Sequence, residues 1–121
     1  MKKILALATL TVLSALPIAP AAAQNLTVKN MIGLCARGDV SQGVSDPSCI
    51  AYFEGYTAAV RTVGRPSGVD PRNAACVPDG VTVDQQVLAL FQYVQADEKS
   101  LDEPAGAGVY KALARAYPCT R

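Results

Sequence analysis

Apolar side chains recur at steps of three and four residues in four separate segments of the chain. This spacing places them on one face of a helix, so it predicts four amphipathic helices. The first, residues 26 to 35, is short. The second begins at Asp46, which can cap a helix, and at Pro47, which suits the first helical position. Its apolar face carries Cys49, Tyr52, Phe53, Tyr56, Ala59, Val60 and Val63.

The third predicted helix has a clear start signal. Thr82 and Gln85 have the spacing of a capping box, in which each side chain binds a backbone N–H near the other residue. The helix is expected to end near Ala96. Its apolar stripe consists of Val83, Val87, Leu90, Phe91 and Val94.

The fourth predicted helix starts near Pro104 and stops before Pro118. Gly106 and Gly108 lie in its first turns and each cost roughly 1 kcal/mol relative to alanine, so these turns are either weak or packed closely against a neighbour. No long stretch of the sequence alternates with the period of a β-strand. The expected fold class is therefore all-α, a small bundle of about four short helices.

The first 23 residues have the three-part build of a secretory signal peptide. Two lysines precede an apolar run from Ile4 to Leu16, and three alanines at positions 21 to 23 supply a cleavage site. The alternative is an uncleaved membrane anchor, but this run is shorter than the ~20 residues needed to span a bilayer. We expect cleavage before Gln24, which leaves residues 24–121 as one exported domain.

Loss of this segment changes the charge balance little. The whole chain has 11 Lys and Arg against 10 Asp and Glu, and two of the lysines lie in the cleaved segment. A near-neutral domain has no basic footprint for nucleic acid or for an anionic membrane. We therefore expect neither as a partner.

Four cysteines remain in the exported domain, and an even number in a small exported chain predicts a disulfide framework with three possible pairings. Cys35 ends the first predicted helix, and Cys49 lies in the first turn of the second. Cys76 precedes the third helix, and Cys119 follows the fourth. If each pair of consecutive helices forms a hairpin, Cys35 joins Cys49 and Cys76 joins Cys119.

The residue inventory disfavours catalysis and cofactors. The chain has no histidine, which excludes Ser-His and Cys-His nucleophilic pairs. No two cysteines have the C-x-x-C spacing of redox, haem or four-cysteine zinc sites, so we expect no cofactor and no metal. The acids Asp97, Glu98, Asp102 and Glu103 form a cluster without a visible base, so we do not expect an enzyme.

Several short motifs follow one another in a specific order between Cys35 and Cys119. They are Cys49-x-x-Tyr52-Phe53-x-Gly55-Tyr56, Cys76-Val-Pro-x-Gly-Val-Thr82-x-x-Gln85, Pro104-Ala105, and Ala112-Leu113 with Ala116-Tyr117-Pro118-Cys119. In this order they resemble the Rap/Tai family of periplasmic immunity proteins. The resemblance implies a small, disulfide-stapled helical protein, often a homodimer, that protects a Gram-negative cell from the peptidoglycan amidases of type VI secretion systems.

The resemblance thus implies a periplasmic protein that binds and inhibits a secreted cell-wall amidase. The alternative is a small periplasmic chaperone or stress protein of the acid-chaperone kind, which would expose apolar surface at low pH. With ten carboxylates and no histidine, only the carboxylates could trigger such a change.

Residues 96 to 103 are the expected contact loop for the partner. Asp97 and Glu98 follow the end of the third helix, where the helix dipole disfavours negative charge by up to ~1 kcal/mol. Surface loops on a rigid scaffold are where binding residues concentrate, so we expect Asp97, Glu98, Lys99 and Ser100 to contact the partner. Tyr93 is expected to join them because it lies off the main apolar stripe, whereas the other tyrosines pack in the core or in a dimer.

Overall fold

The computed structural model describes residues 25–38, 46–64 and 67–120. In these ranges it has no β-strand, only α-helices and short 3-10 helices, which confirms the all-α class. The elements are α1 (Val28–Cys35), α2 (Pro47–Val63), η2 (Pro71–Asn73), α3 (Val83–Ala96), η3 (Glu98–Asp102) and α4 (Ala105–Ala116). The predicted signal peptide, residues 1–23, lies outside the described residues.

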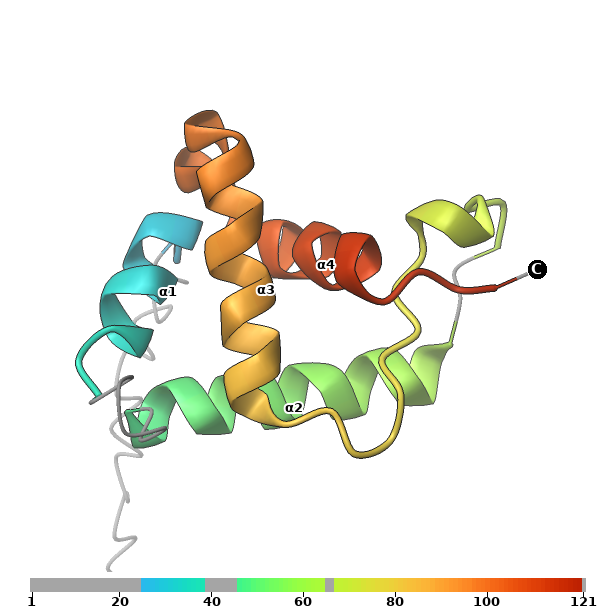
Figure 1. Ribbon diagram of the computed structural model, residues 1–121, viewed down its shortest axis with the longest axis horizontal. Helices are drawn as coiled ribbons and strands as arrows, with labels where there is room; N and C mark the ends of the chain where they lie inside the picture. Colours follow the sequence, from blue (N-terminus) through green and yellow to red (C-terminus); the bar gives the residue numbers. More distant parts are fainter. Residues whose placement is uncertain (1–24, 39–45, 65–66, 121) are drawn as a thin grey trace, which may run out of the picture.

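The four α-helices enclose one core. In Figure 1, α2 lies along the bottom of the view, α1 and α3 stand above it, and α4 crosses α3. α4 packs against both α3 and α1, and α2 packs against α1 and α3. Each helix contributes side chains with at most 1% of their surface exposed: Met31, Phe53, Leu90, Val109 and Leu113.

The predicted helix starts of α2 and α3 are confirmed. The Asp46 carboxylate accepts a hydrogen bond of 2.9 Å from the Ser48 N–H, and Pro47 occupies the first helical position. Thr82 and Gln85 form the expected capping box at the start of α3. These local signals therefore fix where both helices begin.

The start of α1 differs from the prediction by two residues. Thr27 caps this helix in a second capping box, with Asn30 as the reciprocal partner. Leu26 consequently precedes the helix, and 38% of its surface is exposed. It does not belong to the buried apolar face that the spacing predicted.

Gly108 is the point of closest approach between α4 and α1. A Cβ atom built on Gly108 would clash with Cγ2 of Val28, which is fully buried, whereas one built on Gly106 would meet nothing nearer than 3.8 Å. Of the two explanations for these glycines, close packing holds for Gly108. Gly106 serves differently, because its carbonyl accepts a 2.6 Å hydrogen bond from the Tyr56 hydroxyl.

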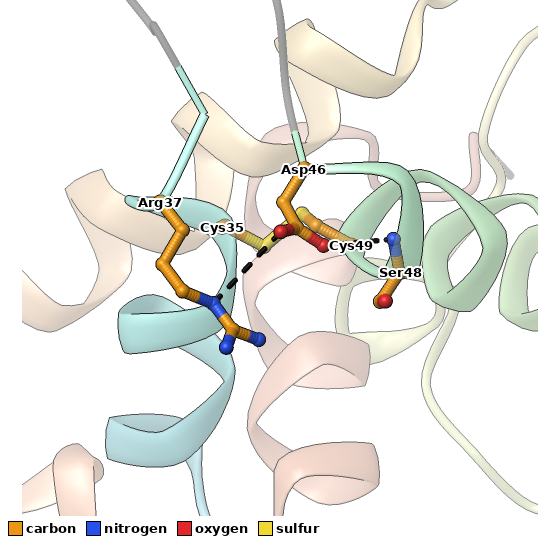
Figure 2. Close-up of a disulfide and its surroundings, with 5 residues drawn as sticks. All are labelled: Cys35, Arg37, Asp46, Ser48 and Cys49. Carbon is orange, nitrogen blue, oxygen red and sulfur yellow. Dashed lines mark hydrogen bonds and ion pairs between the residues drawn. A yellow bond between two sulfur atoms is a disulfide. The ribbon is translucent and has the colours of Figure 1, made fainter.

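The predicted disulfide pairing is confirmed. Cys35 is bonded to Cys49, with their Cα atoms 5.1 Å apart, and Cys76 is bonded to Cys119 at 4.9 Å. Figure 2 shows the first bond between the end of α1 and the first turn of α2. Beside it, the Nε of Arg37 lies 3.8 Å from the capping carboxylate of Asp46, so an ion pair joins the same two helix ends.

One polar pair crosses the core between α2 and α3. The hydroxyl of Thr57 donates a 2.5 Å hydrogen bond to Oε1 of Gln86, and both residues are 3% exposed. Sequence reasoning missed this pair. The available signal was the position of Gln86, three residues after Val83 and four before Leu90, which places it on the buried face of α3.

Candidate functional site

The junction between α3 and η3 is built around Asp97. Its N–H donates to the Val94 carbonyl at 3.1 Å and closes α3, while its carboxylate accepts a 3.1 Å hydrogen bond from the Lys99 N–H and caps η3. We expected an acid here to be costly to the fold, and the structure gives Asp97 a compensating role, because the same residue caps the next helix. An acid is favourable at such a start.

Ser100 lies on the buried side of η3, where only 1% of its surface is exposed. Its hydroxyl donates to the Asp97 carbonyl at 2.6 Å, within the same segment. Ser100 was expected on the contact surface, but in this structure it faces inward. Asp97, Glu98 and Lys99 are exposed, as expected.

The far end of this segment is tied to the start of α1. The Val28 N–H donates to the Glu103 carbonyl at 2.9 Å, and the Ala105 N–H donates to the Leu26 carbonyl at 2.7 Å. An isolated antiparallel bridge joins Thr27 to Pro104. Both ends of the η3 segment and its centre are therefore fixed, so the segment presents its outer side chains from a rigid base.

Glu103 forms a small network that sequence reasoning did not find. Its carboxylate accepts a hydrogen bond of 2.9 Å from Nζ of Lys111 and longer ones of 3.3 and 3.4 Å from the Tyr93 hydroxyl. The hydrogen bond to Glu103 raises the pKa of Lys111. Burial, followed by the charge of Glu103, raises the pKa of Tyr93, so its phenol stays neutral.

This network explains the position of Tyr93, which is half-buried. It was predicted to lie off the main apolar stripe, but it packs against the hydrophobic core. Its hydroxyl faces Glu103 rather than the exposed acids of η3. No sequence signal predicted the contact between Glu103 and Lys111. Glu103 precedes α4 and Lys111 lies inside it, so the spacing of a helix does not relate the two residues.

We define the acidic end as Asp97, Glu98 and Asp102, which are all exposed. Within the described structure, Glu98 and Asp102 make no side-chain hydrogen bond or ion pair, so their carboxylates are available. Figure 1 shows η3 and the end of α3 at the top of the molecule, beyond α1 and α4 and on the side away from α2. The acidic end therefore lies at one end of the helical scaffold, on the side away from α2.

The described residues carry no sign of a metal centre or a membrane span. No three Asp, Glu or Cys side chains among them are grouped as a metal ion would require. None of the described helices has both the length and the apolar character needed to cross a bilayer. What the acidic end offers chemically is a set of hydrogen-bond acceptors for the basic or donor groups of a partner.

Comparison with known proteins identifies the family. A scan against protein families matches residues 27–119, which contain all four α-helices and both disulfides, to the Rap1a immunity proteins. No curated protein and no solved structure matches this chain. Immunity proteins protect against a secreted effector and are generally not enzymes. Because the match covers far more than half of the sequence, this chain belongs to the family of Rap1a immunity proteins.

Proposed function

We propose that this immunity protein acts in the periplasm, where it binds a peptidoglycan amidase delivered by a type VI secretion system and blocks its active site. The observation that carries the proposal is the family match over residues 27–119. Two features support the compartment: the signal-peptide pattern of residues 1–23, and the pairing of all four cysteines as disulfides, which persist in oxidising compartments.

The acidic end is the proposed contact surface. Glu98 and Asp102 have no internal partner within the described structure, so binding would not break an existing ion pair. Lys99 lies beside them, and its N–H, rather than its side chain, is used in the fold. The rigid attachment of η3 limits the conformational entropy lost on binding, which favours affinity.

Tyr93 and Ser100 take supporting roles in this proposal. Ser100 fixes the centre of η3 from the inside, and Tyr93 holds Glu103 at the base of the segment. Both would affect the partner indirectly, through the position of the acidic end. Asp97, Glu98, Lys99 and Asp102 would make the direct contacts.

The test of the contact is the double variant Asp97→Ser/Glu98→Ser. Serine can still cap η3, so folding should be retained. Binding to the cognate amidase, measured by calorimetry, should weaken by more than about tenfold, because close charge pairs at an interface contribute several kcal/mol. Unchanged affinity would exclude the acidic end as the contact.

The matched control is Glu54→Ser/Asp79→Ser. Both residues are exposed acids far from η3 in the sequence, so this variant removes the same charge elsewhere. It should keep full affinity. If both variants weaken binding equally, the effect comes from net charge and not from the acidic end.

The test of the function itself is inhibition. The domain of residues 24–121 is mixed with purified amidases of type VI systems, and cleavage of isolated peptidoglycan is followed. We expect stoichiometric inhibition of one of them. If none of these amidases is inhibited while an effector of another class is bound, the protein remains an immunity protein, but the proposed target is wrong.

The proposal includes a homodimer, which the resemblance implies. Leu88 on α3 is 55% exposed and Val63 on α2 is 76% exposed, so apolar side chains are available for a contact between copies. Sedimentation of the exported domain tests this directly. A monomer at all concentrations would remove the dimer and leave the rest of the proposal intact.

A further inference from the structure

A cleft between α4 and η2 lies apart from the acidic end. Its volume is about 740 Å³, within the range of roughly 300–1,000 Å³ that is usual for binding clefts. Three of its side chains are cationic and three are apolar or aromatic. They are Arg72, Lys111 and Arg115, and Tyr110, Ala114 and Pro118.

The walls of this cleft are fixed by the fold. The Cys119 N–H donates to the carbonyls of both Pro71 and Ala74, at 3.1 and 3.0 Å. The disulfide of Cys119 with Cys76 ties the same two segments together. A ligand would therefore meet a pre-formed surface and would not need to order the chain.

The charge of the cleft is positive but small. No carboxylate lines it among the described residues. Two of its cations are already paired: Arg72 makes two hydrogen bonds with Asp70, at 2.8 and 3.1 Å, and Lys111 pairs with Glu103 at 2.9 Å. Arg115 has no hydrogen bond or ion pair within the described structure. The group thus has one uncompensated positive charge.

We define the floor of the cleft as its apolar and aromatic lining residues, Tyr110, Ala114 and Pro118. Tyr110 lines the cleft, and its hydroxyl is buried and makes no hydrogen bond within the described structure. Ala114 and Pro118 add aliphatic surface beside it. A ligand for this cleft needs both an apolar part for the floor and an anionic group for Arg115.

We propose that the cleft binds an acidic peptide segment of a protein partner, with one carboxylate on Arg115 and an adjacent apolar side chain on the floor of Tyr110, Ala114 and Pro118. One uncompensated cation suits a single carboxylate and would leave a polyanion such as nucleic acid largely unpaired. The guanidinium fork of arginine matches a carboxylate in geometry. This site goes beyond the acidic end and does not depend on the identity of the effector.

The experiment is a nuclear magnetic resonance titration of the exported domain with two capped tripeptides at low salt. The probe is acetyl-Leu-Glu-Leu-amide, and its neutral match is acetyl-Leu-Gln-Leu-amide. We expect the acidic peptide to shift the amide signals of η2 and α4. The neutral peptide should bind about fivefold more weakly, which is the effect of one exposed ion pair.

Matched protein variants identify the cation. Arg115→Gln should reduce the affinity for the acidic peptide about fivefold, to the level of the neutral one. Lys29→Gln removes a charge from α1, where Lys29 is exposed and has no ion pair within the described structure, and should change nothing. Thermal melts of both variants should match the parent, because both side chains are exposed.

Four results would overturn the proposal. They are equal binding of the two peptides, shifts that lie outside the cleft, unchanged affinity in the Arg115→Gln variant, and acetate binding as tightly as the acidic peptide, which would indicate a site for free carboxylates. None of these results bears on the acidic end, so the proposed function stands or falls separately.

Discussion

α1 and the C-terminal tail, residues 117–120, are each attached to the protein by a disulfide, but the surroundings of the two bonds differ. Cys35 and Cys49 are at most 1% exposed and belong to the apolar core. Cys76 is exposed, and its bond to Cys119 lies between two non-helical segments. The first attachment relies on packing, whereas the second relies on backbone hydrogen bonds.

The two bonds contribute to stability in different ways. The first closes a short loop, with 14 residues of sequence separation, and the second a long one, with 43. In the chain-entropy treatment, these loops correspond to roughly 3 and 4 kcal/mol of stabilisation. The bond between the exposed Cys76 and the buried Cys119 therefore contributes the larger entropic share, while the Cys35–Cys49 bond, buried at both ends, also fills space in the core.

The largest expected effect is the loss of both bonds. Their combined contribution, roughly 7 kcal/mol, is comparable to the whole free energy of unfolding of a small domain. In a strong reductant the domain should therefore already be unfolded at physiological temperature, and its circular dichroism melt should show no cooperative transition. A chelator should leave the melt unchanged. A large loss of stability with the chelator alone would show that a metal, and not the disulfides, holds the domain.

The next effect separates the two bonds. Thiol–disulfide exchange needs access to a sulfur atom, so a mild reductant should cleave the bond of the exposed Cys76 first. Alkylation followed by mass spectrometry should label Cys76 and Cys119 before Cys35 and Cys49. The partly reduced protein should lose roughly 4 kcal/mol but stay folded. If all four cysteines are labelled at the same rate, the two disulfides do not differ in their accessibility to the reductant.

The smallest effect tests whether α1 relies on packing. Gly108→Ala drives a methyl group into the buried Val28 of α1 and should lower the free energy of unfolding by about 1–3 kcal/mol. Gly106→Ala, two residues away, has no neighbour nearer than 3.8 Å and should be neutral or raise it by up to ~1 kcal/mol. Urea unfolding measures both. If both substitutions change the free energy of unfolding equally, α4 and α1 are not tightly packed at Gly108.

Local signals predicted most of the fold. Caps and prolines depend on a few adjacent residues, so the starts of α2 and α3 and the end of α3 could be found from sequence, and the disulfide pairing followed from the helix ends. For Gly108 the sequence left two explanations open, a weak first turn of the helix or close packing against a neighbour. Only the structure could decide, because Val28 is 80 positions away in the chain.

The candidate site was predicted in part. The exposed acids were identified, but η3 has no apolar repeat of its own, so the capping role of Asp97 and the burial of Ser100 could not be foreseen. The contacts of Glu103 with Lys111 and Tyr93 join three elements, and the cationic cleft joins η2 to α4. Such groupings depend on tertiary packing, which one sequence does not encode in its local pattern.

The η3 segment divides its positions between two tasks, and this division has an evolutionary consequence. Asp97, Ser100 and Glu103 hold the segment through the cap, the buried hydroxyl and the tie to α1, and Asp97 also belongs to the proposed contact surface. The side chains of Glu98, Lys99 and Asp102 take no part in these hydrogen bonds. If η3 is the contact surface for the effector, as proposed, we expect the second group to vary with the effector while the first group keeps the shape of the segment. Such an immunity protein could change its target without a change of scaffold.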